Sequence, residues 1–416
     1  MRKNNFVAGL SIVMILVISL IIVTSGCKSV SEPINNASET MLETNKSATD
    51  SNGKAVATDS SIKDWERASN KRYNDSIRKI IQDRNMTTVK VGLSEPAQEE
   101  YFNQIHGGMF TMMKEIQDLY GLKWEYVFEA ATIHADIESQ QNALRTWSNQ
   151  GFHAITICTG ADIGAIDSLF GELKEKNNTY AYYFNMPPRL LLQDSSSPIN
   201  DLTMEARSNI GYDQYLAHYK GVEWVAEVLT LKYGEPRGKI GLVWFPPSLW
   251  SMERENGLMA ALEKYPNIEI VDKVLGDYTR AGGMKAAEDL LTKDPDIDVL
   301  YAENSEMALG ASQAAQNRGL KTWNWETKDG LIILGANGTL SECKEIIAGN
   351  LTGDISANPV QNGRELIEAI FWDRVLGWQI DKIINTPTEV IDIRNVDTHL
   401  GLGEWALSFE YPSGGY

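Results

Sequence analysis

Short apolar runs alternate with segments of helical periodicity along most of the chain. The runs are about six residues long, as buried strands are, and apolar residues at helical spacing follow each of them. Strands are predicted at 88–94, 123–130, 153–160, 179–186, 238–245, 268–276, 297–304 and 330–337. Strands that alternate with helices predict βαβ units and parallel sheets. Because two such blocks follow one another, the sequence predicts an α/β fold of two doubly wound parallel-sheet lobes and an internal structural duplication.

Three segments precede the first predicted strand. Residues 1–26 have a basic start, an almost wholly apolar run and small residues before Cys27, which predicts a secretory signal and acylation of Cys27. A plain transmembrane anchor is the alternative, because the apolar run approaches spanning length. Residues 27–61 are rich in Ser, Asn and Thr, and this composition predicts a disordered tether. Residues 62–86 are predicted to form an amphipathic helix. In either case we expect the folded part at the extracytoplasmic face of the cell membrane.

Composition narrows the classes of function. A chain of 416 residues suits two domains, and 43% hydrophobic residues can form a core. The net charge of −18 disfavours nucleic acid as a partner, because phosphates would be repelled. We expect Cys158 and Cys343 to be buried thiols, and the five His residues show no metal-ligand spacing. The sequence therefore predicts no metal and no cofactor.

Polar side chains follow the predicted strands, most clearly at 303–306 (Glu-Asn-Ser-Glu). In open α/β sheets, ligands bind beyond the carboxyl ends of the strands. This rule selects the loops 94–102, 160–162, 185–189, 245–254, 303–306 and 336–339. The sequence therefore predicts a cleft for a small polar ligand where two lobes face one another across these loops.

Residues 276–319 (GDYTRAGGMKAAEDLLTKDPDIDVLYAENSEMALGASQAAQNRG) resemble the most diagnostic stretch of type I periplasmic binding proteins, the ribose- and galactose-binding-protein-like receptors of ABC sugar importers. Further similar stretches follow in the family's order at 137–157, 208–229, 333–369 and 385–397. The resemblance covers roughly residues 87–396, and the order of the stretches is more specific than any one motif. It implies two lobes joined by a three-crossing hinge with the ligand cleft between them.

The resemblance also implies lobe boundaries and a hinge. The N-terminal lobe would comprise residues 87–211 and 361–388, and the C-terminal lobe residues 212–360 and 389–416. Gly211 and Asp213 lie at the first crossing and are the candidate bending point, although an ordinary strand-to-helix turn would look the same.

The family's ligand positions, carried over one by one, fall on Phe102, Asn185, Arg254, Ser305, Asn337 and Gln361. Phe102 would stack on a sugar ring, and Trp250 in the Pro-rich loop either stacks on a sugar face or packs in the loop. Arg254 is interpreted as a ligand residue whose guanidinium donates hydrogen bonds to ligand hydroxyls or to a carboxylate. The alternative is an Arg on the helix surface that pairs with Glu253 or Glu255. For Asn304 and Ser305 the alternative is helix capping, and we expect one of them to cap while the other faces the cleft.

Three positions depart from the family pattern. Asn185, Ser305 and Asn337 stand where sugar-binding members often have Asp, whose carboxylate accepts two hydrogen bonds from neighbouring hydroxyls. This disfavours simple monosaccharides such as ribose, unless Glu95, Asp136, Glu303 or Glu306 supplies a carboxylate from a shifted position. Receptors for furanosyl quorum signals have a Trp and a second Arg where Ala336 and Ala357 stand here, so that ligand is not expected.

Two functions remain open at this level. The first is a lipid-anchored solute-binding protein that captures a carbohydrate-like molecule by hinge closure and delivers it to an ABC permease. The second is a sensory receptor of the same fold that signals to a membrane histidine kinase. Both use a closing cleft. An enzyme is not expected, because the sequence has no nucleophile elbow and no carboxylate pair of notable spacing.

Overall fold

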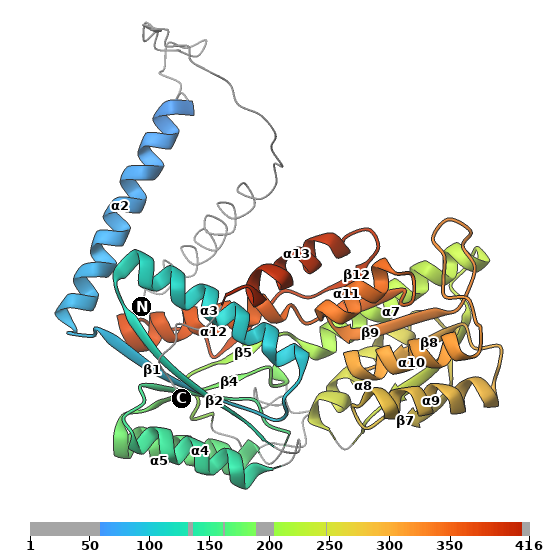
Figure 1. The fold of residues 1–416 in the computed structure, drawn as a ribbon, viewed down its shortest axis with the longest axis horizontal. Coiled ribbons are helices and arrows are strands. Elements are labelled where there is room, and N and C mark those ends of the chain that lie inside the picture. The colour runs from blue at the N-terminus through green and yellow to red at the C-terminus, as the bar shows by residue number, and fades with distance from the viewer. Residues whose placement is uncertain (1–58, 132–135, 161–162, 189–203, 247, 410–416) are drawn as a thin grey trace, which may run out of the picture. The chain divides into compact units, whose positions relative to one another are not determined.

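A computed structural model describes residues 59–131, 136–160, 163–188, 204–246 and 248–409 (Figure 1). The chain separates into two compact units, residues 1–66 and 67–416, and the second contains both sheets. The predicted signal sequence, Cys27 and most of the predicted tether lie outside the described residues. Within the described ranges, no helix is long and apolar enough to cross a membrane.

The first sheet has six strands in the order β11-β5-β4-β3-β1-β2, and all its neighbours are parallel. Its strands are β1 (Thr88–Glu95), β2 (Lys123–Ala130), β3 (Ala154–Ile157), β4 (Tyr180–Phe184), β5 (Asn209–Gly211) and β11 (Ile383–Asn385). Helices α4 (Ile137–Asn149) and α5 (Ile163–Asn177) cover one face, while α3 (Glu100–Tyr120) and α12 (Pro359–Ile370) cover the other (Figure 1). Because both faces are covered, the central β3 is buried along its whole length.

The second sheet repeats this winding with the order β12-β10-β9-β8-β6-β7. Its strands are β6 (Gly238–Trp244), β7 (Ile268–Leu275), β8 (Val299–Ala302), β9 (Ile332–Asn337), β10 (Gly353–Ser356) and β12 (Glu389–Asp392). Only the edge strand β12 is antiparallel to its neighbour β10. The predicted fold class of two doubly wound parallel-sheet lobes is thereby confirmed.

The helices of the second lobe are α7 (Gln214–Tyr233), α8 (Leu249–Leu262), α9 (Arg280–Lys293), α10 (Ser305–Asn317) and α11 (Leu340–Ile347). They pack in pairs, α7 with α8 and α9 with α10. Glycines allow the paired helices to approach each other closely. A Cβ at Gly310 in α10 would lie only 2.1 Å from the Arg280 carbonyl oxygen of α9. The same holds in the first lobe, where a Cβ at Gly108 in α3 would lie 2.0 Å from the Val360 carbonyl oxygen of α12. Large side chains are therefore excluded where these helices cross.

The chain passes between the two sheets three times, after β5, after β10 and after β11. The last helix, α13 (Val396–Leu407), packs against α3 of the first lobe as well as α11 of the second. At this contact, a Cβ on Gly107 of α3 would lie 3.0 Å from the backbone of Ala406. The sequence predicts this C-terminal segment as part of the second lobe, whereas its contacts link it to both lobes.

Two further elements support the first lobe. The leading helix α2 (Asp59–Asp83) buries Ile77 and Ile81, and its Arg78 donates to the Leu119 carbonyl of α3 at 2.9 Å. Helix α12 continues into a π-helix, η1 (Phe371–Leu376), whose Asp373 accepts a hydrogen bond from Arg207 Nε at 2.7 Å. Both elements pack on the lobe away from the strand ends where ligands are expected.

Candidate functional site

A cavity lies beyond the carboxyl ends of the strands of both sheets, with about 370 Å³ of space that includes its opening to solvent. Its lining consists of Pro96, Glu99, Tyr101, Phe102, Asn185, Trp250, Arg254, Tyr278, Asn304 and Asn337. The first lobe supplies five of these residues and the second lobe the other five, so a ligand in the cavity would contact both lobes.

Arg254 lies on α8 and is only 5% exposed. Its Nη1 donates to the Glu303 carbonyl oxygen, and its Nη2 donates to the Tyr212 hydroxyl at 2.9 Å. Burial alone lowers the pKa of Arg254, but the phenols of Tyr212 and Tyr278 and the Glu303 carboxyl keep that pKa above its ordinary value. The alternative of an Arg on the helix surface is thereby excluded, and the guanidinium is held rigidly at the wall of the cavity.

Asn185 and Trp250 join the two lobes at the cavity. The Trp250 indole, on α8, donates to the Asn185 carbonyl oxygen at 2.9 Å, and Trp250 is 5% exposed. Asn185 has a φ of 54°, a left-handed conformation that Asn adopts more readily than most residues. Its Oδ1 is buried and has no hydrogen-bond partner among the described residues. The amide oxygen is therefore available to a ligand hydroxyl.

Phe102 and Tyr101 begin α3 and form the aromatic wall of the first lobe. Their rings meet edge to face with centroids 5.2 Å apart, and Phe102 also packs edge to face on Phe184 at 6.3 Å. The Tyr101 hydroxyl is buried and has no partner within the described part of the chain. Burial raises the pKa of Tyr101 well above its ordinary value, so this hydroxyl is a neutral donor.

The polar cluster after β8 divides into separate roles. Asn304 caps α10 by accepting a hydrogen bond from Met307 N at 3.0 Å, and it also lines the cavity. The Ser305 hydroxyl donates to the Ala336 carbonyl oxygen at 3.3 Å, and Ser305 is not part of the lining. We had expected one residue to cap and the other to face the cleft, whereas Asn304 does both.

The Glu303 carboxyl lies next to the cavity without lining it. Its Oε2 accepts hydrogen bonds from Phe245 N at 3.2 Å and from the Ser251 hydroxyl, while its Oε1 has no partner among the described residues. Burial raises the pKa of Glu303 to about 7. This carboxyl is therefore only partly ionised at neutral pH.

Two other predicted ligand residues lie away from the cavity lining. Glu95 is buried, and its Oε2 is 2.9 Å from His106 Nε2. Gln361 lies on α12 and donates to the Glu365 carboxylate at 3.0 Å. Neither is part of the lining. The roles of both residues stay predictions.

Sequence reasoning did not select four lining residues, Pro96, Glu99, Tyr101 and Tyr278. Glu99 and Tyr101 lie in the selected loop 94–102, but only Phe102 and Glu95 were picked from it. Tyr278 follows β7, and Asp277 and Tyr278 both have positive φ angles of 58° and 63°. The sequence Gly-Asp-Tyr after a predicted strand was the available signal for this sharp turn.

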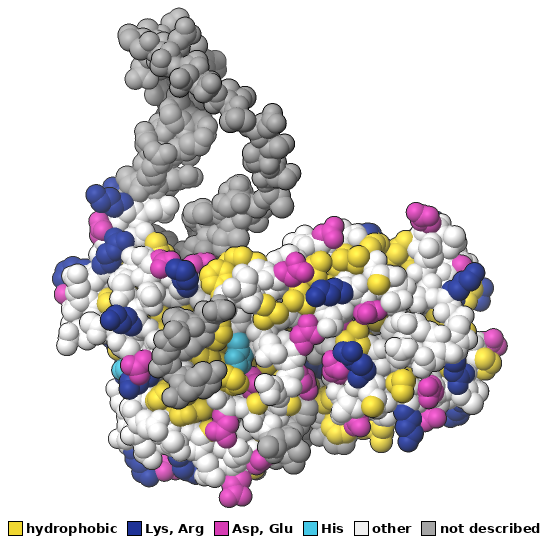
Figure 2. All heavy atoms as spheres, in the orientation of Figure 1, with side chains coloured by type: hydrophobic (Ala, Val, Ile, Leu, Met, Phe, Trp, Pro, Cys, Tyr) yellow, Lys and Arg dark blue, Asp and Glu magenta, His cyan; other side chains and the backbone are white. Residues whose placement is uncertain are grey.

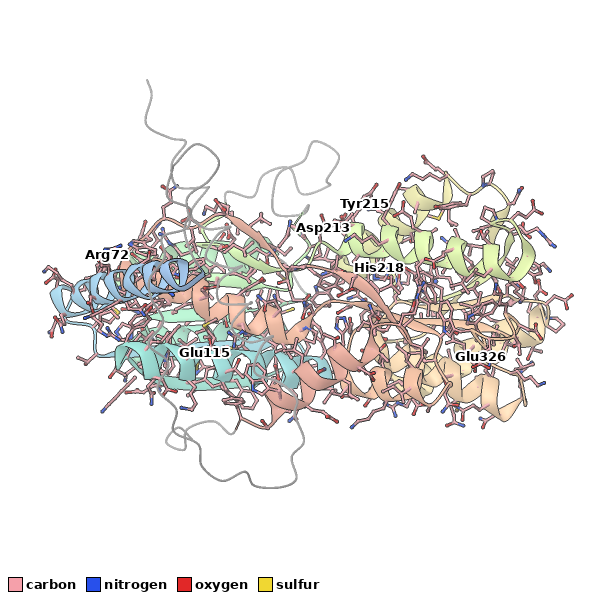
Figure 3. The ribbon with its side chains drawn as sticks, turned by 90° about the horizontal axis from the view of Figure 1, so that it is seen from above. Arg72, Glu115, Asp213, Tyr215, His218 and Glu326 are labelled. Carbon is pink, nitrogen blue, oxygen red and sulfur yellow. The ribbon has the colours of Figure 1, made fainter. Side chains whose placement is uncertain are left out.

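Of the two predicted hinge residues, Gly211 lies directly beside Asn185 of the cavity lining. A Cβ on Gly211 would be 2.8 Å from the backbone nitrogen of Asn185, so only glycine fits there. Asp213 caps α7 by accepting a hydrogen bond from Leu216 N at 3.0 Å. Figure 3 shows Asp213 at the start of α7, followed along that helix by Tyr215 and His218. Bending at these residues stays a prediction.

On the face shown in Figure 2, the charged side chains do not gather into one patch, since Lys and Arg side chains are interspersed with Asp and Glu side chains. No group of three or more His, Cys, Asp or Glu side chains that could hold a metal ion occurs within the described ranges.

Comparison with known proteins gives similar sequences and similar folds. The ribose import binding protein RbsB of Escherichia coli K12 is 28% identical over 172 residues, 41% of this chain and 53% of that protein. The D-allose-binding periplasmic protein of the same organism is 28% identical over 145 residues, 35% of this chain and 43% of that protein. The matches therefore span about half the length of these relatives.

Solved structures share the fold at lower identity. A solute-binding protein from Actinobacillus succinogenes 130z with bound D-allose has a TM-score of 0.62 at 19% identity, covering 74% of this chain and 99% of that one. An arabinose-binding component from Shewanella sp. ANA-3 has a TM-score of 0.63 at 19% identity, covering 78% and 100%. The model of the periplasmic binding protein domain matches residues 91–371, more than half of the chain. The chain therefore belongs to the periplasmic binding protein domain family.

Proposed function

We propose that this protein is an extracytoplasmic receptor that captures a carbohydrate-like small molecule by closing its two lobes and delivers it to an ABC permease. The observation that carries the proposal is the shared cavity, to which each lobe supplies five lining residues. A ligand that touches both lobes has contacts in the closed form that the open form lacks, and this difference drives closure.

The chemistry of the lining supports a sugar or a similar polar compound. Phe102 and Trp250 offer flat apolar surfaces, which suit the carbon face of a sugar ring. The amides of Asn185, Asn304 and Asn337 can each donate and accept hydrogen bonds to hydroxyls. The relatives named for ribose and D-allose agree with this class of ligand. Since their names describe binding proteins, we also propose that the chain is not an enzyme.

Anchoring is part of the same proposal. The basic start, apolar run and small residues before Cys27 support secretion and acylation of that cysteine. A receptor that serves a permease benefits from a tether, because the tether raises its concentration at the membrane. Metabolic labelling with a palmitate analogue, compared with Cys27→Ser, tests this step; an unlabelled wild-type chain would refute it.

A sensory role is the second candidate. One solved structure with the same fold is the fructose-binding periplasmic domain of a hybrid two-component system, with a TM-score of 0.59 at 19% identity over 75% of this chain and 93% of that one. The two roles differ in their partners, a permease with its ATPase or a histidine kinase. Loss of solute uptake on deletion of the gene supports the importer, and normal uptake with a lost transcriptional response supports the sensor.

Binding itself is tested with the full chain in mild detergent against mono- and oligosaccharides, polyols and sugar acids. A ligand at 100 times its Kd should stabilise the protein by about 2.7 kcal/mol. Arg254→Ala should abolish the stabilisation, whereas Arg280→Ala, which removes an exposed Arg paired with Glu306, should retain it. Stabilisation that persists in Arg254→Ala would place the ligand elsewhere, and no stabilisation by any compound would refute the proposed function.

A further inference from the structure

Arg254 is a buried cation that has no ion pair with the described residues. It is 5% exposed, and no Asp or Glu oxygen of those residues lies within salt-bridge distance of it. Both of its observed hydrogen bonds go to uncharged oxygens, the Glu303 carbonyl and the Tyr212 hydroxyl. Its Nε is buried and has no partner in the described part of the chain. A buried charge is unfavourable unless a counter-charge accompanies it.

The remaining lining does not supply that counter-charge. Seven of the other lining residues are uncharged aromatic or amide side chains, and another is proline. The single carboxylate of the lining, Glu99, precedes α3 on the opposite lobe and is only partly buried. The Glu303 carboxyl accepts hydrogen bonds from Phe245 N and the Ser251 hydroxyl instead of the guanidinium, and burial raises its pKa to about 7. Arg254 thus lacks a full negative partner at neutral pH.

We propose that the ligand of this cavity is a sugar acid whose carboxylate pairs with Arg254, an inference that rests on the proposed function. A guanidinium matches a carboxylate in shape and can bind both of its oxygens, and one cation balances one monoanion. Both lobes line the cavity, so a molecule paired with Arg254 would also contact the first lobe. The hydroxyls of that molecule would then meet the amides of Asn185, Asn304 and Asn337.

Matched pairs of neutral and acidic sugars test the inference. The full chain in mild detergent is titrated with galactose and galacturonate, glucose and glucuronate, ribose and ribonate, and arabinose and arabinonate, with tryptophan fluorescence as the signal, since Trp250 lines the cavity. We expect at least one acid to bind ten or more times more tightly than its neutral partner. Arg254→Met should remove this preference, Arg254→Lys should keep part of it, and Arg280→Ala should leave it unchanged.

The outcomes separate this inference from the proposed function. Equal or tighter binding of the neutral members, lost in Arg254→Met, would overturn the sugar acid and keep the carbohydrate receptor. An acid preference that survives in Arg254→Met would also overturn the inference, because the carboxylate would then pair elsewhere. If no sugar and no sugar acid binds, both proposals fail. If Arg254→Met does not fold, wild type is compared with Arg254→Lys instead. Lys has a single charged amine in place of the two-pronged guanidinium, so this substitution must weaken the binding of the sugar acid more than the binding of the neutral sugar.

Discussion

Replacing Glu303 with Gln should remove a large part of the pH dependence of stability. Glu303 is 1% exposed, and its carboxyl receives hydrogen bonds from Phe245 N and the Ser251 hydroxyl. Burial raises its pKa from an ordinary value of 4.5 to about 7. Gln has nearly the same shape and keeps an oxygen for both donors, but it does not titrate. The substitution therefore isolates the cost of ionising this buried group.

Proton linkage gives the sign and the size of the effect that ionisation of Glu303 has on stability. Because the folded-state pKa of Glu303 is raised, the folded protein holds a proton that the unfolded chain has already released between about pH 4.5 and 7. The stability contributed by the proton is fully present below pH 4.5 and is lost as the pH rises through 7. A rise of 2.5 pKa units at 1.36 kcal/mol each gives about 3 kcal/mol as the upper bound of the loss.

Urea unfolding of wild type and Glu303→Gln at pH 5, 6, 7 and 8 measures this loss. As the pH rises, the free energy of unfolding of Glu303→Gln should increase relative to that of the wild type, by up to about 3 kcal/mol at pH 8. Glu306→Gln, which removes a partly exposed carboxylate paired with Arg280, is the matched control and should show no such trend. Burial also raises the pKa of Asp354, to about 6. Asp354 changes the free energy of unfolding with pH equally in wild type and variants, so its contribution cancels in the comparison. A difference that is constant with pH would show that Glu303 is already ionised when folded and serves as the counter-ion of Arg254.

Three further substitutions test the packing of the first lobe. Gly108→Ala should lower the free energy of unfolding by about 1–3 kcal/mol in urea, because its Cβ would lie 2.0 Å from a carbonyl oxygen of α12; an unchanged midpoint would contradict this. Asp373→Asn should lower the free energy of unfolding by about 1–2 kcal/mol, since it weakens the ion pair between the buried Asp373 and the partly exposed Arg207, and a double-mutant cycle with Arg207→Met should show the coupling. Gly211→Ala should weaken ligand binding at least tenfold, because its Cβ would displace the backbone of Asn185, and unaltered affinity would refute the close approach.

The long regular elements of the fold could be predicted from sequence because their burial leaves a periodic pattern. The apolar runs at β3, β8 and β9 are buried along their whole length, as helices on both faces require. The strands β5 and β11 have only three residues each and leave no such run. Helix α3 begins at Glu100, inside the segment 94–102 that the sequence predicts as a loop, because Tyr101, Phe102 and Ile105 extend its buried stripe. Short strands and helix starts depend on tertiary contacts that one local window cannot reveal.

The cavity shows a similar limit at the level of single side chains. The rule that ligands bind at the carboxyl ends of parallel strands located most of the correct loops, since it depends only on strand order. Which side chain in a loop faces the cavity depends on the φ angles of the turn, and these are not encoded in hydrophobic periodicity. In the first loop the turn directs Glu99 to the cavity while Glu95 pairs with His106, and after β8 it directs Asn304 there while Ser305 bonds to the backbone. Two of the neutral amides in the lining, Asn185 and Asn337, stand where the family pattern often has Asp, so their lack of charge could be derived from residue types. The burial of Arg254 beside them could not be derived in this way, because it results from tertiary contacts with Tyr212 and Glu303.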